Sequence, residues 1–285
     1  MKKIYLIFLL VISLFIFYSC TNLLSNTGTV KLSITDSPID GANIKGVYID
    51  VTGISYSMST GDTGWTKLDL KEEKLFNLLE FTNGDAKIMG NFNLPAGKIN
   101  QIRFFLDTNK SFIKFSNDST TTLSIPSGDT TGYKATISGG ATIPVNGQIE
   151  ITADFDVRKS LNLIGNGLYK LQPTIRLIVN NQAGVIKGQI TDASTDTTVF
   201  AYSNNSYNTS DIEFSSAINS SRLRDNGTFE LHYLSAGTYD LVFAKFTTDG
   251  TLSLLGGISN IEVKSNQITN VPTTTINNLE NVSIW

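Results

Sequence analysis

The sequence is poor in the side chains that most often carry catalysis or hold metals. Its 285 residues include one cysteine, Cys20, and one histidine, His232. A zinc site and a Cys-His catalytic pair therefore lack the groups that they need. A Ser-His-Asp triad would have to use His232, and the sequence contains no G-x-S-x-G segment. These absences favour a protein that is not an enzyme, and they predict His232 to be a solvent-facing or hydrogen-bonded strand residue.

Charge is also scarce. Charged residues make up 16% of the chain, the formal net charge is −3, and basic residues do not cluster in blocks. This composition lacks the positive surface that a nucleic-acid partner requires. With a single cysteine no disulfide can form within the chain, so its stability has to come from apolar cores, which a chain of this length can build.

The one long hydrophobic run stands at the N-terminus. Lys2 and Lys3 precede the apolar stretch from Ile4 to Tyr18, which only Ser13 interrupts. The stretch is shorter than the roughly 20 residues that cross a bilayer, and its layout is that of a secretory signal peptide.

Residues 1–19 resemble a bacterial lipoprotein signal peptide, because Ser19 and then Cys20 follow the hydrophobic run, although Phe17 departs from the usual aliphatic residue. The resemblance implies that Cys20 becomes the lipidated first residue of the mature chain and that residues 20–27 are a tether. It also implies an exported protein of the bacterial cell envelope, anchored to a membrane, with the outer membrane favoured. The alternative is an incidental cysteine beside a differently cleaved signal.

Beyond Gly28, apolar and polar residues alternate over short segments separated by turn-forming residues. The alternation covers 30–34, 47–51, 102–106 and 149–157, then 186–190, 229–231, 239–243 and 261–263. Short strands at this spacing predict an all-β fold made of two β-sandwiches, of the Greek-key, immunoglobulin-like or transthyretin-like kind. The boundary is expected at residues 180–184, between an N-terminal sandwich over 28–179 and a C-terminal sandwich over 185–285.

Two segments depart from this pattern. Residues 71–79 place Leu75, Leu78 and Leu79 on one helical face and predict a short helix. Residues 203–226 are rich in Ser and Asn, with scattered apolar residues. They predict a long surface loop or a loosely held edge hairpin.

One short pattern occurs twice. Leu94-Pro95-Ala96-Gly97 and Leu234-Ser235-Ala236-Gly237 both stand immediately before a predicted strand. The pattern predicts a turn that needs glycine in a conformation other residues avoid.

Several motifs of the first part, in this order, resemble Domain of Unknown Function 4382, a family of bacterial exported proteins. They are Gly28-x-Val30-x-Leu32-x-Ile34-Thr35-Asp36-Ser37-Pro38, Trp65-Thr66-Lys67-Leu68, Leu94-Pro95-Ala96-Gly97, Gln101-Ile102-Arg103, Ile125-Pro126-Ser127-Gly128, Asp154-Phe155-Asp156 with Lys159-Ser160, and Tyr169 to Arg176. The resemblance covers Gly28 to Val179. It implies an all-β, envelope-associated domain and supplies no catalytic residues.

The second part resembles the transthyretin-like or carboxypeptidase-regulatory-like sandwich. The resemblance rests on Gly188-x-Ile190 and on the segment from Gly227 to Tyr239. It implies an accessory module, and some related sandwiches bind carbohydrate. The insertion around residues 206–222 departs from the compact form of these modules.

Carboxylates are the remaining source of chemistry. Asp154 and Asp156 are spaced by two on a predicted strand and would point to the same face. Solvation and pairing with Arg158, Arg103 or Arg176 are the favoured roles, with a calcium site and glycoside-type hydrolysis as alternatives. Asp36 precedes the Ser37-Pro38 turn and is expected to cap it, with calcium again as the alternative. No cofactor other than calcium is suggested.

Exposed aromatic rings are what a sugar ligand would stack on. Trp65 follows the turn at residues 61–64 and is expected to pack at a core or sheet edge, with ligand contact as the alternative. Tyr202 and Tyr207, beside or within the polar segment 203–226, are the better candidates for exposed contacts.

The sequence therefore predicts a non-enzymatic lipoprotein at the membrane periphery that binds or scaffolds a glycan or an envelope protein. A purely structural stalk or assembly subunit is the alternative, and a carboxylate-dependent hydrolase ranks third.

Overall fold

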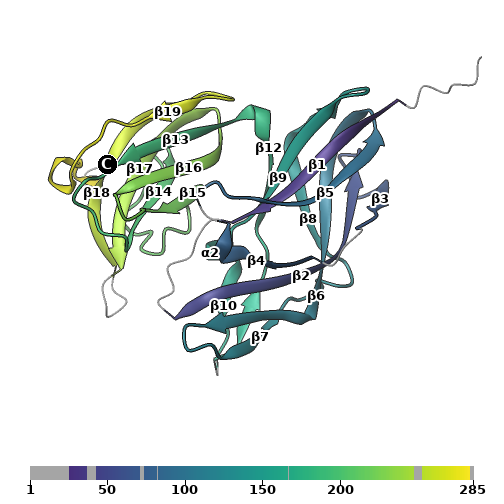
Figure 1. Cartoon of the computed structure of the whole chain (residues 1–285), viewed down its shortest axis with the longest axis horizontal. Helices are drawn as coiled ribbons and strands as arrows, with labels where there is room; N and C mark the ends of the chain where they lie inside the picture. Colours follow the sequence, from purple (N-terminus) through teal and green to yellow (C-terminus); the bar gives the residue numbers. More distant parts are fainter. Residues whose placement is uncertain are drawn as a thin grey trace, which may run out of the picture.

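The computed structural model describes residues 26–36, 43–70, 74–81, 83–165, 167–246 and 252–282. Nearly every element in this part of the chain is a strand, which confirms the predicted all-β class (Figure 1). Cys20 and residues 1–19 lie outside the described residues, so lipidation stays a prediction.

The first sandwich holds two facing sheets. Its elements are β1 (Thr27–Thr35), β2 (Ile44–Ser57), β3 (Trp65–Leu68), β4 (Lys74–Asn77), the 3-10 helix η1 (Leu78–Glu80), β5 (Lys87–Pro95), β6 (Gly97–Phe115), β7 (Thr120–Ser124), β8 (Tyr133–Ile143), β9 (Gln148–Phe155), α2 (Val157–Ser160), β10 (Leu161–Leu163), β11 (Tyr169–Leu171) and β12 (Ile175–Val179). The smaller sheet has the order β12-β9-β1-β5. The larger has the order β10-β11-β7-β6-β2-β3, with β4 also paired to β2 and β8 to β6.

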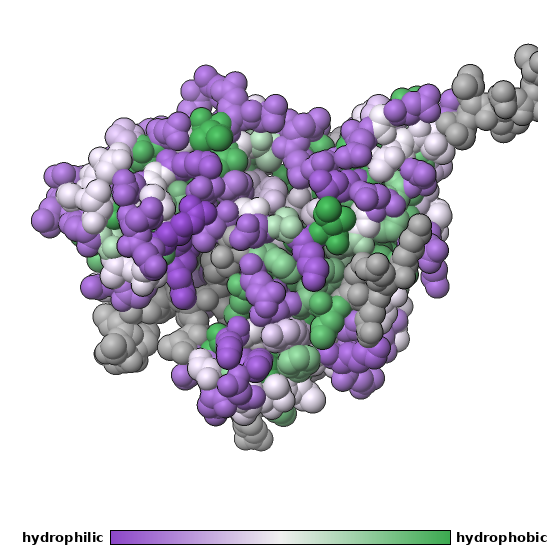
Figure 2. Space-filling model, viewed as in Figure 1, coloured by the Kyte–Doolittle hydropathy of each residue, from purple (hydrophilic) through white to green (hydrophobic). Residues whose placement is uncertain are grey.

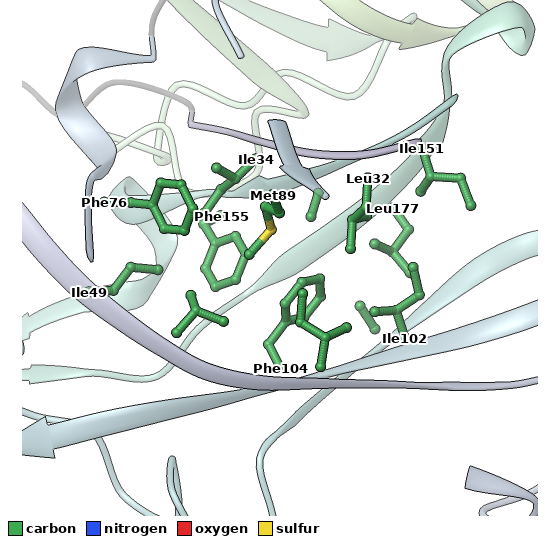
Figure 3. Close-up of a cluster of buried hydrophobic side chains, with 14 of the residues drawn as sticks. Leu32, Ile34, Ile49, Phe76, Met89, Ile102, Phe104, Ile151, Phe155 and Leu177 are labelled. Carbon is green, nitrogen blue, oxygen red and sulfur yellow. The ribbon is translucent and has the colours of Figure 1, made fainter. Parts of the chain in front are cut away.

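The alternating pattern of the strands produces the core between these sheets. Leu32 and Ile34 of β1 are fully buried and lie across from Phe104 of β6, as Figure 3 shows. The Phe104 ring meets the Phe155 ring edge-on, with 5.2 Å between their centroids. Each such side chain contributes about 1.5–3 kcal/mol on burial, so this core can stabilise the sandwich without a disulfide.

The second sandwich follows directly. Its elements are η2 (Asn180–Gln182), β13 (Ala183–Gln189), β14 (Thr197–Ser203), β15 (Asn219–Arg222), β16 (Thr228–Ser235), β17 (Gly237–Phe246), β18 (Leu252–Val263), β19 (Ile268–Asn270) and η3 (Ile276–Asn278). A three-stranded sheet, β16-β13-β19, faces a four-stranded sheet, β15-β14-β17-β18. Ile186, Leu231, Leu241 and Phe243 fill the core between them.

The helix expected over residues 71–79 is wrong. Residues 74–77 form β4, which pairs with β2, and residues 78–80 form η1; residues 71–73 lie outside the described part. Leu75 is 45% exposed, whereas Phe76, Asn77 and Leu78 are buried, so the leucines do not form the single buried face that a helix would give them. Pairing with β2 satisfies the backbone of a segment that is too short to be a stable helix.

The repeated Leu-x-Ala-Gly pattern forms the same corner twice. One alanine, Ala96 or Ala236, separates β5 from β6 and β16 from β17. Gly97 has a φ of +142°, as the pattern predicts, whereas the φ of Gly237 lies outside the left-handed region. The predicted need for glycine therefore holds in the first copy and is wrong in the second.

The two sandwiches contact each other through arginines of the first and main-chain carbonyls of the second. Arg158, in α2, donates to the carbonyl oxygens of Phe214 and Ala217. Arg176, in β12, donates to the carbonyl of Tyr233 at 3.1 Å. The Tyr233 hydroxyl in turn donates to the carbonyl of Gly84 at 3.1 Å. Figure 1 shows α2 on the side of the first sandwich that faces the second.

Candidate functional site

Tyr202 is buried, so its expected exposure is wrong. Its side chain has 0% exposure, and its hydroxyl donates to Asp211 Oδ2 at 3.0 Å. Burial, together with the nearby Asp211 carboxylate, raises the pKa of Tyr202. A ring enclosed in this way cannot stack on a sugar.

The polar segment that follows β14 is the reason for this burial. Val199 and Ala201 face the sandwich core, while Phe200 and Tyr202 point to the other face of the strand. Phe214 covers that outer face, with its ring stacked on Phe200 at 3.9 Å between centroids. The segment therefore carries a small core of its own.

Asp211 fixes the turn that presents Phe214. Its carboxylate accepts hydrogen bonds from the backbone N–H groups of Ser215 and Ser216, at 2.8 and 2.9 Å. Burial opposes ionisation, but these bonds and those from Tyr202 and the Ser215 hydroxyl lower the pKa of Asp211. The expected edge strand is present as β15, but the segment is firmly held.

Tyr207 is half-buried in the same cluster. Its ring lies edge-on to Tyr202, with 5.0 Å between centroids. A contact between Tyr207 and a ligand stays a prediction.

Trp65 begins β3 and is half-exposed at a sheet edge, as expected. Its indole N–H donates to Asp62 Oδ1 at 3.0 Å, and the Arg103 guanidinium lies 4.1 Å from the centre of its ring. The hydrogen bond from Trp65, supported by the charges of Lys134 and Arg103, lowers the pKa of Asp62 against the effect of burial. One face of the indole is therefore occupied by a cation, and its role as a ligand contact stays a prediction.

Asp154 and Asp156 are paired with cations, as expected, but both are buried, so their expected solvation is wrong. Asp154 Oδ2 lies 2.7 Å from Arg176, and Asp156 Oδ2 lies 3.3 Å from Arg158 and 3.4 Å from Lys159. The two carboxylates are 2% and 5% exposed. Neither lines the groove described below.

Asp156 also caps α2, because its side chain accepts from the backbone N–H of Lys159. Burial raises the pKa of Asp156, and the Arg158 and Lys159 charges only partly offset that effect. Asp36 Oδ1 accepts from the backbone N–H of Val157 at 2.9 Å, so this buried aspartate supports the same short helix. The turn that Asp36 was expected to cap, residues 37–42, lies outside the described part.

Within the described ranges, no group of three or more His, Cys, Asp and Glu side chains could hold a metal ion. The carboxylates of Asp154 and Asp156 are already neutralised by cations. Calcium binding stays a prediction, and nothing in the described side chains adds to it.

His232 is half-buried, and its Nε2 lies 2.7 Å from Glu230 Oε2, so the predicted hydrogen-bonded strand histidine is confirmed. Lys187 and Arg224 also bind Glu230, at 3.0 and 3.2 Å. Burial would raise the pKa of Glu230, but hydrogen bonds from His232, Lys187 and Arg224 outweigh it and lower the pKa to about 2.

A groove of about 350 Å³ lies between β3 and β5 in the first sandwich. Its lining combines hydrogen-bonding groups with a partly apolar floor. The lining residues are Tyr56, Thr66, Lys67, Leu68, Asp69, Asn91, Phe92, Asn93 and Leu94. Tyr56, Phe92 and Leu94 are buried, whereas Lys67, Asn91 and Asn93 are exposed.

The two strands that border this groove each end a sheet. β5 is the last strand of the smaller sheet and pairs only with β1 among the described residues. β3 is the last strand of the larger sheet and, in the same part of the chain, pairs only with β2. Open edges present backbone N–H and C=O groups to whatever occupies the groove. This groove is the candidate site.

The sequence did not indicate the groove. Trp65-Thr66-Lys67-Leu68 and Leu94 stood out as motifs, but their adjacency depends on how two sheets face each other. The face seen in Figure 2 is mostly hydrophilic, with hydrophobic residues in small separate groups. In the described ranges, no helix has the length and apolar character to traverse a bilayer.

Comparison with curated proteins finds no match. Among solved structures, the chain is similar to the TIE protein of Bacillus anthracis, with 12% identity and a TM-score of 0.22 over 87% of this chain and 34% of that one. It is similar to BcpA, the major pilin subunit of Bacillus cereus, with 11% identity and a TM-score of 0.22 over 87% of this chain and 69% of that one. A fimbrial protein from Bacteroides ovatus matches with 8% identity and a TM-score of 0.22, over 87% of this chain and 49% of that one.

Likeness at this level supports no inference about function. This chain spans about a third of the length of the first of these proteins.

The comparison with protein families identifies one family. Residues 27–173, just over half of the chain, match the family described as Domain of unknown function (DUF4382), and the chain belongs to that family.

Proposed function

We propose that this protein is a non-enzymatic lipoprotein of the bacterial cell envelope that scaffolds a protein partner through the groove between β3 and β5. The signal-like residues 1–19 and Cys20 support export and lipid anchoring. The second sandwich, of the transthyretin-like or carboxypeptidase-regulatory-like kind, serves as an accessory module. The proposal takes the outer membrane as the site of anchoring.

The observation that carries the proposal is the position of the groove between two open strand edges. An extended peptide segment can add to such an edge through main-chain hydrogen bonds, while pockets between alternate side chains select its sequence. Leu68, Phe92 and Leu94 offer apolar contacts, and Asn91 and Asn93 offer amides on the opposite strand. This pattern suits a peptide strand.

A glycan is the less favoured ligand, because the aromatic platform it would need is not assembled. Tyr202 is buried, Tyr207 packs in the same cluster, and one face of Trp65 is covered by Arg103. Sugar hydroxyls could still bind the amides of the groove.

The alternative from another class is a structural stalk. Its support is the contact between the sandwiches, where Arg158 and Arg176 bind carbonyls of the second sandwich. Such a contact would hold the accessory module at a fixed angle. A hydrolase using Asp154 and Asp156 is the weakest alternative, because both carboxylates are buried and bound to cations.

A photo-crosslinking residue placed at Asn91 tests the proposal in whole cells, with the same residue at Ile212 as control. Ile212 is 71% exposed on the other sandwich. We expect a discrete adduct from Asn91 alone, with the crosslinked partner peptide identified by mass spectrometry. Identical adducts at both positions would contradict a specific groove.

A melting screen of the purified chain against envelope glycans covers the second ligand class. A glycan present at 100 times its dissociation constant would stabilise the fold by about 2.7 kcal/mol. A clear rise in melting temperature, lost on replacing Asn91 and Asn93, would move the assignment from protein to glycan.

A further inference from the structure

The chain enters the first sandwich at one defined end. The carbonyl of Asn26 accepts from the N–H of Ala96 at 2.6 Å, and the carbonyl of Thr27 accepts from the N–H of Asn146 at 2.8 Å. These bonds hold the start of β1 between the corner at 95–97 and the turn at 144–147.

The larger sheet contributes its β2–β3 turn to the same end. β6 starts here at Gly97, and its Gln101 is paired with Ser57, the last residue of β2. The Gln101 side chain donates to the carbonyls of Ser59 and Gly61, at 2.8 and 2.7 Å. We call this region the tether end, defined by residues 26–27, 58–65, 95–98 and 144–147.

The tether end is positive on a chain whose net charge is negative. Lys98 lies within it, and Arg103 and Lys134 lie beside it, against the carboxylate of Asp62, which is 2.6 Å from Arg103 and 3.8 Å from Lys134. The neighbouring carboxylate of Glu150 is balanced by Lys31, 3.0 Å away. The segments 91–106 and 133–149, which build most of this end, contain no Asp or Glu, although the whole chain has a formal charge of −3. Positive charge is therefore concentrated near the point where the chain enters the first sandwich.

Amphipathic side chains accompany these cations. The half-exposed Trp65 carries Arg103 over one face of its ring, and Val145, at the tip of the 144–147 turn, is 53% exposed. Tryptophan is favoured at the boundary between water and lipid, where its ring lies among headgroups while its N–H stays hydrogen-bonded. A positive surface with Trp and Val side chains matches an anionic bilayer surface in both charge and polarity.

The number of residues between Cys20 and Asn26 limits how far the tether end can lie from a membrane. Residues 20–25 can span at most about 20 Å when fully extended. A lipid on Cys20 would hold the tether end within that distance of the headgroups. We infer that the tether end lies against the anionic headgroups of the membrane, with Lys98, Lys134 and Trp65 facing them, an inference that rests on the proposed lipidation of Cys20.

The test attaches the chain from Cys20 onward to maleimide-lipid through that residue, the only cysteine in the sequence. The conjugate is placed in vesicles of phosphatidylcholine with or without phosphatidylglycerol. Trp285→Phe leaves Trp65 as the only tryptophan. A headgroup-bound quencher then reports whether Trp65 approaches the bilayer.

We expect Trp65 to be quenched in the anionic vesicles, and the quenching to be lost in high salt and in a Lys98→Glu, Lys134→Glu variant. The matched control carries Trp65→Phe and Leu163→Trp, which moves the probe to the β10–β11 hairpin at the other end of β6, where Leu163 is 64% exposed. The control should show only background quenching. Equal quenching at both positions, or none at Trp65, would overturn the inference.

Because the lipid is attached to Cys20 chemically, the quenching test does not depend on whether Cys20 is acylated in the cell. Acylation is tested separately. Mass spectrometry of the protein isolated from envelope membranes reports whether Cys20 is acylated in the cell. An unmodified Cys20 would refute the lipoprotein proposal and with it the reason for this orientation. An acylated Cys20 with an unquenched Trp65 would refute the orientation alone.

Discussion

The Arg176 guanidinium donates a hydrogen bond to the main-chain carbonyl of Tyr233, 3.1 Å away, across the boundary between the sandwiches. Its other amino group lies 2.7 Å from the buried carboxylate of Asp154. One arginine thus neutralises an acid inside the first sandwich and binds the second.

Replacing Arg176 with alanine should therefore destabilise the protein by about 2–3 kcal/mol, since it removes a charge-assisted bond and the arginine partner of a buried carboxylate. Urea unfolding measures the loss. Arg224→Ala is the control, because Arg224 pairs with Glu230 while 43% exposed, and a surface pair contributes about 0–1 kcal/mol. Similar losses in the two variants would contradict the role given to Arg176.

Phe214 is expected to anchor the segment over β14. Phe214→Ala should cost about 3–5 kcal/mol, because the side chain is 1% exposed and stacks on Phe200. The control is Ile212→Ala, two residues away and 71% exposed, which should change stability by less than about 0.5 kcal/mol. Thermal unfolding of both variants compares them, and a small effect for Phe214 would show that the segment is held some other way.

Gly84 lies at the contact between the sandwiches, against His232 and Tyr233. It has a φ of +88°, and a Cβ atom there would come within 2.4 Å of the His232 ring. Gly84→Ala should therefore combine backbone strain of about 1–2 kcal/mol with a steric clash.

Gly167→Ala provides the control for the strain alone. Gly167 has a φ of +73° with no atom within 4 Å of the added Cβ. We expect Gly84→Ala to lower the melting temperature further and to speed proteolysis at η2. Equal melting temperatures would mean that the His232 ring yields without cost.

The Glu230 cluster predicts a loss of stability in acid. The pKa of Glu230 in the folded protein is about 2, below the model-peptide value of about 4.3, so ionised Glu230 favours folding. This contribution is complete above about pH 4.3 and is lost as the pH falls through 2. Urea midpoints between pH 5 and 2 should fall less steeply in Glu230→Gln than in the unmodified protein.

Lys187→Met gives a second readout, since it removes one cation from Glu230. The Glu230 pKa, followed by carboxyl NMR, should rise in this variant. A Glu230 titration that is unchanged would contradict the assigned cause of the shift.

The sequence predicted those features that depend on local pattern. Period-two alternation located the strands around Leu32, Phe104 and Leu241, because one face of each strand is buried. The spacing of Asp154 and Asp156 predicted cation pairs, and Arg158 and Arg176 supply them.

It did not predict features that depend on contacts between distant segments. The helix over 71–79 failed because pairing with β2 outweighed the leucine spacing. Tyr202 was expected to be exposed because its neighbours are polar. The unbroken apolar run from Val199 to Tyr202 did carry the opposite signal, that of a strand buried on both faces. The groove between β3 and β5 had no local signal at all.

The contact between the sandwiches uses main-chain carbonyls of Phe214, Ala217 and Tyr233 as acceptors. Every amino acid supplies such a carbonyl, so recognition here depends on the path of the backbone and not on the identity of the acceptor residue. These three bonds survive a change of side chain on the second sandwich, provided that the backbone keeps its path, whereas the bonds from the Tyr233 and Ser221 hydroxyls to Gly84 and Asn83 depend on those side chains. The part of the attachment made by the arginines therefore recognises the fold of the second sandwich, and would let that module vary its surface away from Tyr233 and Ser221.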